Sequence, residues 1–199
     1  MLRMVLDQKI KDTRIILLRH GKVDYPPISI LSASSFSEWV AAYDSNKLDV
    51  SSKPSDDAMR IATNTNAVVC SELPRSLESA KVLGFEDITL CHSLFNEAGL
   101  PTANWNYPHL SVRIWVILFR LIWFFGYSDN CETYAEAKAR ASHASNKLIE
   151  IAEEHQSVIF IGHGIINRFI ANELRKRGWS GPKIPSRKYW DFGIYNRKI

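Results

Sequence analysis

The sequence predicts an α/β fold: a doubly wound, mainly parallel sheet with helices on both faces and a small helical cap insertion. Three segments, 13–20, 66–71 and 157–164, are continuous apolar runs of strand length that are rich in β-branched residues. Such runs indicate strands that are buried on both faces. Segments with helical spacing separate them, and strands that alternate with helices typically form a parallel sheet. No internal repeat or low-complexity linker divides the 199 residues, so we expect a single domain.

In the first half of the chain, the ends of the elements are marked by local signals. The first strand runs into Gly21, and one helix opens with Ser55 followed by two acidic residues, as helix N-termini commonly do. Another helix begins at Pro74 and ends at Gly84, the usual order of these two residues. The expected elements are a strand at 13–20, helices at 37–45 and 55–65, a strand at 66–71 and a helix at 74–84.

In the second half, the longest element is an amphipathic helix. Another helix ends in basic residues and Gly178, and the final segment alternates around Gly193, which is typical of an edge strand. The expected elements are a weaker strand at 87–92, helices at 132–155 and 166–178, the strand at 157–164 and an edge strand at 187–197.

Segment 111–127 is far more hydrophobic than its surroundings. It is shorter than the ~20 apolar residues that a membrane span needs, and Arg120 stands near its middle. On a helix, Arg113 and Arg120 share one stripe and the other faces are apolar. We assign this helix to a cap insertion at about 98–134. It is interpreted as a buried cap helix; a face that contacts an apolar substrate, a partner or a membrane surface is the less favoured alternative.

The composition is that of a globular protein with a core: 46% of the residues are hydrophobic and 23% are charged. The scattered Cys70, Cys91 and Cys131 form no CxxC pair, which argues against a zinc site or a disulfide framework and favours a reducing, cytoplasmic location. Residues 1–14 are too polar for a signal peptide.

The net charge of +4 favours anionic partners. We interpret the basic and aromatic segment 175–190 as a solvated surface, so no nucleic acid is expected.

Three of the predicted strand ends carry residues suited to one anion. The first ends in Arg19-His20-Gly21, the second leads through "SELPR" to Arg75, and the third ends in His163-Gly164. Ligands of doubly wound sheets bind at the carboxyl ends of the strands. Two arginines and two histidines beside helix N-termini suit a dianionic tetrahedral group such as phosphate.

Taken together, "LLRHG", "SELPRSLESA" and "FIGHG" resemble the motifs of the histidine phosphatase superfamily, the phosphoglycerate mutase-like proteins. The resemblance covers most of the chain, from about Thr13 to the last helix. It implies a small-molecule phosphate ester as substrate, with no metal and no other cofactor. By the matching motif positions, it implies the following roles: His20 as the nucleophile, Glu97 as the proton donor, His163 as the second histidine of the pocket, and Arg19, Gly21, Arg75 and His163 as phosphate-binding residues.

The segment after "RHG" departs from the family pattern. Lys22 and Val23 replace an acidic residue or Gln followed by Thr, and "KVDYPPISILSAS" lacks the Asn and Gly that the mutase branch adds. This favours a metal-independent phosphomonoesterase acting through a phosphohistidine. A mutase-like phosphotransferase, or a catalytically idle protein that binds an anion or a partner through the apolar cap helix, remains an alternative.

Some further residues are candidates for contacts with the substrate. Lys22, Asn96 and Asn167 each have an alternative role: facing solvent, capping a turn and lying on a helix surface, respectively. The tryptophans and the apolar run of the cap suggest room for an apolar leaving group. The sequence does not indicate an oligomeric state.

Overall fold

The structure is a computed structural model that describes residues 12–25 and 30–198. The prediction that residues 1–14 are not a signal peptide concerns mainly residues 1–11. The departure from the family pattern after Gly21 concerns in part residues 26–29. Both segments lie outside the described residues.

The described chain has a mostly parallel sheet and a separate two-stranded pair. The sheet strands are β1 (Asp12–Arg19), β3 (Ala67–Cys70), β4 (Leu90–Cys91), β6 (Ser157–Gly162) and β7 (Phe192–Lys198), and the pair consists of β2 (Ile30–Leu31) and β5 (Leu110–Ser111). The sheet order is β4-β3-β6-β1-β7; only β7, at one edge, is antiparallel to its neighbour. The predicted α/β fold is confirmed, including the edge strand near the end of the chain.

The helices occur where the cap signals and the periodicity predict them, with ends shifted by a few residues. They are α1 (Ala33–Ser45), α2 (Asp56–Thr63), α3 (Pro74–Val82), α4 (Val112–Phe124), α5 (Tyr134–His155) and α6 (Gly164–Lys176), with a short 3-10 helix, η1 (Ser93–Phe95). The Ser55 hydroxyl caps α2 by accepting from the Ala58 N–H, and Thr133 with Glu136 forms a capping box on α5.

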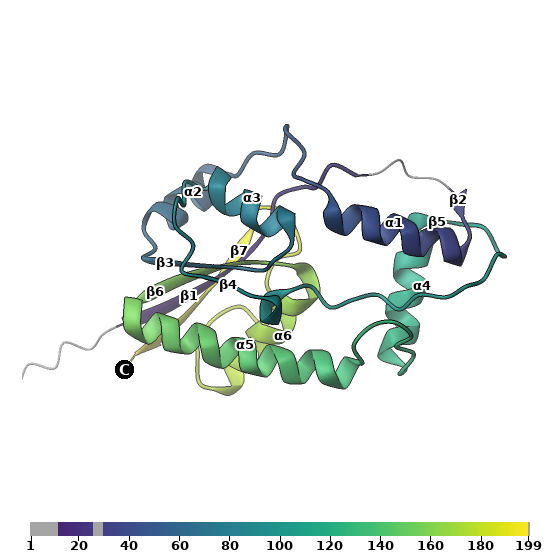
Figure 1. Ribbon diagram of the computed structural model, residues 1–199. Helices are drawn as coiled ribbons and strands as arrows, with labels where there is room; N and C mark the ends of the chain where they lie inside the picture. The colour runs from purple at the N-terminus through teal and green to yellow at the C-terminus, as the bar shows by residue number, and fades with distance from the viewer. Residues whose placement is uncertain (1–11, 26–29, 199) are drawn as a thin grey trace, which may run out of the picture.

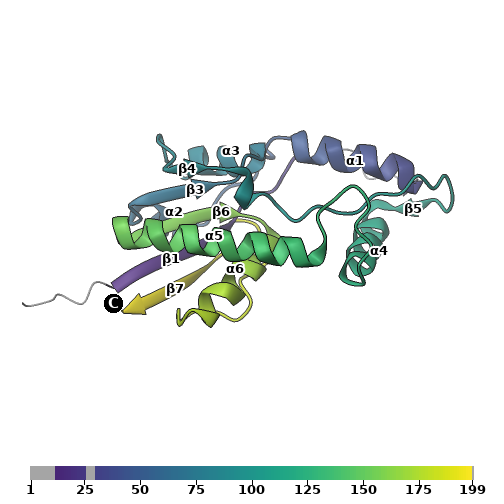
Figure 2. The ribbon, with the colours of Figure 1, turned by 60° about the horizontal axis from the view of Figure 1, so that its bottom comes forward.

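Each face of the sheet has its own apolar core, because successive side chains of a strand point to opposite faces. Ile15 and Leu17 pack in the core beneath α5 and α6, whereas Ile16 and Leu18 pack in the core beneath α2 and α3. The two helix layers lie on opposite sides of the strands in Figure 2. The sheet is therefore doubly wound, and the carboxyl ends of β1, β3 and β6 are held rigidly at one edge.

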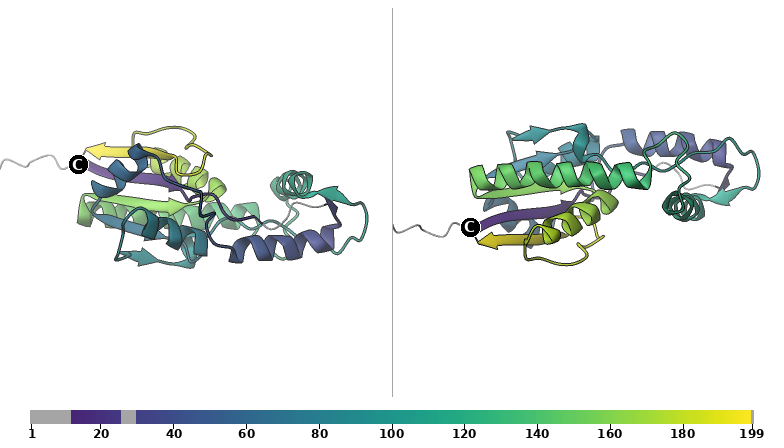
Figure 3. Two further views of the ribbon diagram at one scale, coloured as in Figure 1. Left: turned by 90° about the horizontal axis from the view of Figure 1, so that it is seen from above. Right: turned by 90° about the horizontal axis from the view of Figure 1, so that it is seen from below.

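A cap lies beyond these carboxyl ends (Figures 1 and 3). It contains α4 and the β2–β5 pair, and α1 packs with them although it precedes α4 by more than sixty residues. The Phe36 ring of α1 lies 6.3 Å from the Trp115 ring and 5.5 Å from the Phe119 ring, centroid to centroid. The cap therefore uses residues 30–45 as well as the expected insertion at about 98–134.

Helix α4, which forms most of segment 111–127, is buried on one stripe only. The buried side chains are those of Val112, Trp115, Phe119 and Trp123. On the opposite side Ile114, Ile117 and Leu121 are 50%, 55% and 51% exposed. Trp115 is therefore part of the cap core, and Trp123 packs against α5 and α6, so neither forms an apolar contact surface. In the described part of the chain, no helix is long and apolar enough to cross a bilayer.

Candidate active site

The three motifs meet where β1, β3 and β6 end. Arg19 pairs in register with Gly162 on the neighbouring parallel strand, so His20 and His163 leave the sheet at the same level. Their ring centroids are 5.0 Å apart. Arg75, in the first turn of α3, lies against His163, with its Nε 3.3 Å from the imidazole Nδ1. The structure thus brings together one arginine and two histidines from three separate motifs.

The hydrogen bonds of His20 determine which of its ring nitrogens is free. The Nδ1 atom lies 2.7 Å from the carbonyl oxygen of Gly21. A carbonyl can only accept, so Nδ1 carries the hydrogen and Nε2 keeps its lone pair. Among the residues that the structure describes, no group hydrogen-bonds to Nε2. His20 is 2% exposed and therefore presents an oriented nucleophilic nitrogen in a nearly dry site.

His163 has both ring nitrogens engaged. Its Nδ1 accepts from Arg75 Nε, so the hydrogen is on Nε2, which donates to the Ser71 hydroxyl at 2.7 Å. His163 is 1% exposed and Arg75 is 2% exposed. The imidazole therefore orients the guanidinium of Arg75, and Ser71 at the end of β3 orients the imidazole.

Both histidines are uncharged at neutral pH. Burial, followed by the positive charge of Arg75, lowers the pKa of His20 to about 3. Burial also lowers the pKa of His163 well below its ordinary value, with further contributions from His20 and Arg75. A neutral imidazole is the form that can accept a phosphoryl group.

Arg19 borders the histidine pair from β1. It donates from Nη1 to the carbonyl oxygen of Arg187, and its guanidinium lies over the Tyr189 ring, 4.2 Å from the centroid. Its Nε is buried with no hydrogen-bond partner in the described part of the chain. A buried, unpaired donor is costly, and an anion oxygen would satisfy it.

Aromatic side chains from three distant segments cover the site. The Tyr189 ring lies 5.7 Å from the His20 ring, and its hydroxyl contacts that of Tyr25. Tyr25 stacks on Tyr43, whose ring lies 4.9 Å from the Arg75 guanidinium. Burial raises the pKa of Tyr43 to about 12, so its phenol stays protonated. The three tyrosine rings therefore pack over His20 and the Arg75 guanidinium.

The carboxylate of Asp44 is paired with the Arg75 guanidinium. Asp44, near the end of α1, accepts from Arg75 Nη1 at 2.9 Å. The arginine side chain is 3% exposed and that of the aspartate is 45% exposed. Asp44 therefore occupies one donor of the Arg75 guanidinium, which is then not free for another anion.

Glu97 lies beside the site but is held by backbone amides. Its carboxylate accepts from the N–H groups of Ala98, Ile165 and Ile166 at 3.0–3.2 Å. The latter two belong to the first turn of α6, which directly follows His163. Glu97 therefore caps this helix, which begins without a side-chain cap of its own. It also borders a cavity of about 330 Å³ together with Arg19.

The loop that carries Glu97 is held in place by Arg140 of α5. Arg140 of α5 donates to the carbonyl oxygens of Leu94 and Asn96, both at 2.8 Å, and pairs with the Glu132 carboxylate. The Asn96 side chain accepts from the Glu72 N–H at 3.0 Å. Asn96, a candidate for contact with the substrate, thus ties two loops together.

Gly21 and Lys22 are engaged in contacts within the protein. The Gly21 N–H, expected to bind phosphate, donates to the Ser79 hydroxyl at 2.9 Å, and its carbonyl holds His20. A Cβ at Gly21 would lie 2.3 Å from the Trp190 ring, so only glycine fits there. Lys22 pairs with Asp49 at 2.6 Å on the exposed side of the loop, as the solvent-facing alternative anticipated.

The alternative role of Asn167 placed it on a helix surface, whereas the structure buries it. It is 2% exposed and donates to the Leu18 carbonyl at 3.1 Å, which ties α6 to the end of β1.

Sequence reasoning missed Asp44 and the covering tyrosines. Tyr25, Tyr43 and Tyr189 come from a loop, a helix end and the segment before β7. No motif or spacing links them, and they meet only through the tertiary fold. In the described part of the chain, no three His, Cys, Asp or Glu side chains are grouped as a metal site requires.

Comparison with known proteins gives structural matches only. No protein-family model and no curated protein matches the sequence. A solved structure of the open reading frame Rv3214 from Mycobacterium tuberculosis matches with a TM-score of 0.56 at 16% identity, over 94% of this chain and 95% of that one. A putative alpha-ribazole-5'-P phosphatase from Escherichia coli matches with a TM-score of 0.54 at 16% identity, over 81% and 79% of the two chains.

A mycobacterial glucosyl-3-phosphoglycerate phosphatase is also similar. Its TM-score is 0.51 at 19% identity, and the match covers 83% of this chain and 80% of that one. At 16–19% identity these matches show the fold alone, and they agree with the α/β fold predicted from the sequence.

Proposed function

We propose that this chain is a histidine phosphatase: a metal-independent phosphomonoesterase that forms a phosphohistidine at His20. One observation carries the proposal. A buried, neutral His20 has its Nδ1–H held by Gly21 and its Nε2 free, with Arg75 and the unpaired Nε of Arg19 nearby. A pocket that only bound an anion would need the arginines but not an oriented nucleophile. The three free cysteines support a reducing compartment such as the cytoplasm.

In the first step, His20 Nε2 attacks the phosphorus of the monoester. The nitrogen–phosphorus bond forms as the bond to the ester oxygen breaks, and the electron pair leaves with that oxygen. Arg19 and Arg75 balance the charge on the equatorial oxygens, which a preorganised pair of guanidinium groups stabilises best in the transition state. The Nδ1–H···O bond to Gly21 stabilises the positive charge that the ring acquires.

The leaving oxygen needs a proton, and Glu97 is the proposed donor. Its carboxyl group borders the cavity beside Arg19. To donate, it must exchange its contacts with the α6 amides for one with the ester oxygen. In the second step a water molecule attacks the phosphorus and gives up a proton to the same carboxylate. The bond to His20 then breaks and inorganic phosphate leaves.

The test is hydrolysis of p-nitrophenyl phosphate by the purified protein in EDTA. We expect the wild type to release inorganic phosphate and His20→Ala to lose at least about a thousandfold in kcat/KM, as loss of a nucleophile typically does. His143→Ala, at an exposed histidine of α5, is the matched control and should keep full activity.

Two results would contradict the proposal: retained turnover in His20→Ala, or loss of wild-type activity in EDTA that added metal restores. Transfer of the phosphoryl group to a second hydroxyl, with no net release, would instead favour the mutase alternative.

A further inference from the structure

A groove runs between the cap helix α4 and helix α6, past Arg19 and past Gly164, the residue after His163. It begins with the 330 Å³ cavity at Arg19 and continues into one of about 140 Å³. Both cavities are lined by Arg120, Ile165 and Arg187, so they adjoin. A third cavity, of about 270 Å³, shares Ile165 and Arg168 with the second. The groove therefore extends along the first two turns of α6.

One wall of the groove is apolar. Val116, Ile117 and Leu121 of α4 line its first cavity, and they are 37%, 55% and 51% exposed. Ile165 of α6 lies opposite and lines all three cavities. The exposed face of α4 is thus in part the wall of this groove, and an apolar group lying in it would cover that surface.

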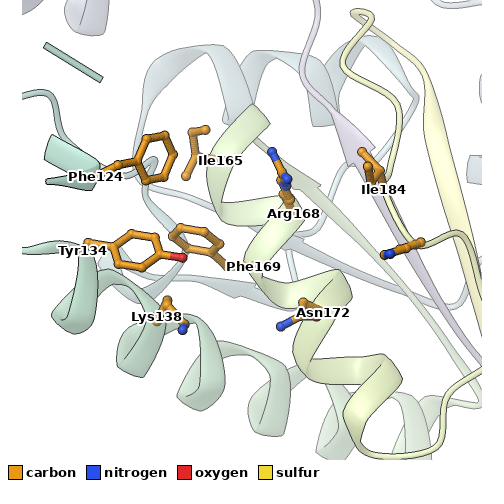
Figure 4. A pocket seen from close by; sticks show the side chains of 9 residues that line it. Phe124, Tyr134, Lys138, Ile165, Arg168, Phe169, Asn172 and Ile184 are labelled. Atoms are coloured by element: carbon orange, nitrogen blue, oxygen red, sulfur yellow. The ribbon is translucent and has the colours of Figure 1, made fainter. Parts of the chain in front are cut away.

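The middle of the groove is strongly cationic. Arg120, Arg168 and Arg187 all line the second cavity, and no acidic residue does. Within residues 12–25 and 30–198, neither Arg168 nor Arg187 pairs with a carboxylate. In Figure 4 the Arg168 side chain lies between Ile165 and Ile184 at the third cavity. Three guanidinium groups gathered in a concave site form a region of positive potential that attracts an anion.

We propose that this groove binds the leaving group of the substrate, and that Arg168 and Arg187 hold a second anionic group on it. The inference rests on the proposed phosphatase function. The substrate class is then a phosphomonoester whose leaving group has an apolar segment and ends in a carboxylate or a second phosphate. Arg168 lies one helical turn, about 6 Å, beyond Gly164, which follows His163 and lines the first cavity, so the leaving group would extend along roughly one turn of α6.

The test is direct binding, which does not depend on turnover. Two phosphonates that cannot be hydrolysed, hexylphosphonate and 6-phosphonohexanoate, are compared by titration calorimetry. They differ only in the terminal carboxylate. We expect the wild type to bind the carboxylate compound at least about tenfold more tightly, as a charge-assisted contact to arginine allows. In Arg168→Gln and in Arg187→Gln this ratio should fall towards one. Arg113→Gln, at an exposed arginine of α4 outside the groove, should keep it.

Equal affinities for the two phosphonates in the wild type would overturn the inference, as would failure of both to bind. A preference that survives in both Arg168→Gln and Arg187→Gln would place the second anion elsewhere and overturn it as well. Hydrolysis of p-nitrophenyl phosphate decides the proposed function separately. Hydrolysis with no preference for the carboxylate compound refutes only the groove assignment.

Discussion

The protonation of the two buried histidines links the site to the stability of the fold. The pKa of His20 is about 3 in the folded protein, against 6.5 for the exposed side chain. Between pH 6.5 and about pH 3, the His20 side chain is protonated in the unfolded chain but not in the folded chain. The part of the free energy of unfolding that depends on His20 is therefore highest above pH 6.5 and decreases as the pH falls towards 3.

We expect this loss to reach up to about 1.4 kcal/mol per pH unit for each such histidine. Urea unfolding at a series of pH values measures it. His20→Gln should flatten the dependence between pH 6 and 4, whereas the control His143→Gln, at an exposed position, should not. Equal slopes for the wild type and His20→Gln would show that the pKa of His20 is the same in the folded and the unfolded protein.

The second prediction at the residue scale concerns Glu97. Glu97→Gln keeps an oxygen that can accept from the α6 amides but removes the proton donor. We expect kcat/KM for an alkyl phosphate, which reports the transfer of the phosphoryl group to His20, to fall by about 10²–10⁴-fold. For p-nitrophenyl phosphate, whose leaving group needs no proton, the loss in kcat/KM should be small, although hydrolysis of the phosphohistidine should slow for both esters.

Glu72→Gln, at an exposed carboxylate on a neighbouring loop, is the control for Glu97→Gln. Equal losses for the alkyl and the aryl ester would assign Glu97 to positioning α6 and not to proton transfer.

Among the elements, α1 contributes a carboxylate beside Arg75, where we propose that phosphate binds. Its Asp44 pairs with Arg75 and thus opposes a bound dianion both by competition and by repulsion. Asp44→Asn should therefore tighten inhibition by inorganic phosphate by roughly threefold to tenfold. Asp57→Asn, which breaks an exposed pair with Arg60 on α2, is the matched control. Weaker inhibition in Asp44→Asn would show instead that Asp44 holds Arg75 in its binding position.

The elements also show how far the sequence allows prediction. The convergence of His20, Arg75 and His163 was predictable, because parallel strands bring their carboxyl ends to one edge of the sheet. The contribution of α1 to the cap was not. Its contact with α4 joins segments more than sixty residues apart, and both have apolar faces that many partners would satisfy.

The same limit applies to single side chains at the site. The capping of α6 by Glu97 and the covering of His20 by Tyr189 depend on loop conformations that carry no periodic signal. The apolar pattern of 111–127 predicted a helix but could not show that only one stripe of it is buried.

At the scale of the whole molecule, the sheet and the cap contribute different residues to the site. The doubly wound sheet fixes the histidines and arginines through three strand ends, and the cap contributes Asp44, Tyr43 and one wall of the groove. In the two proposals made above, the sheet carries the chemistry and the cap selects the leaving group. The central claim therefore concerns the sheet edge and not the cap: a phosphoryl group passes through His20.

Trapping the intermediate tests this claim most directly. The protein is mixed with a ³²P-labelled monoester in EDTA, quenched within milliseconds, and the label is mapped by peptide analysis. We predict label on the peptide that contains His20, labile in acid and stable in base, as expected of a phosphoramidate, and none in His20→Ala. Label on a serine or on His163, or full turnover with no label on His20, would contradict the account.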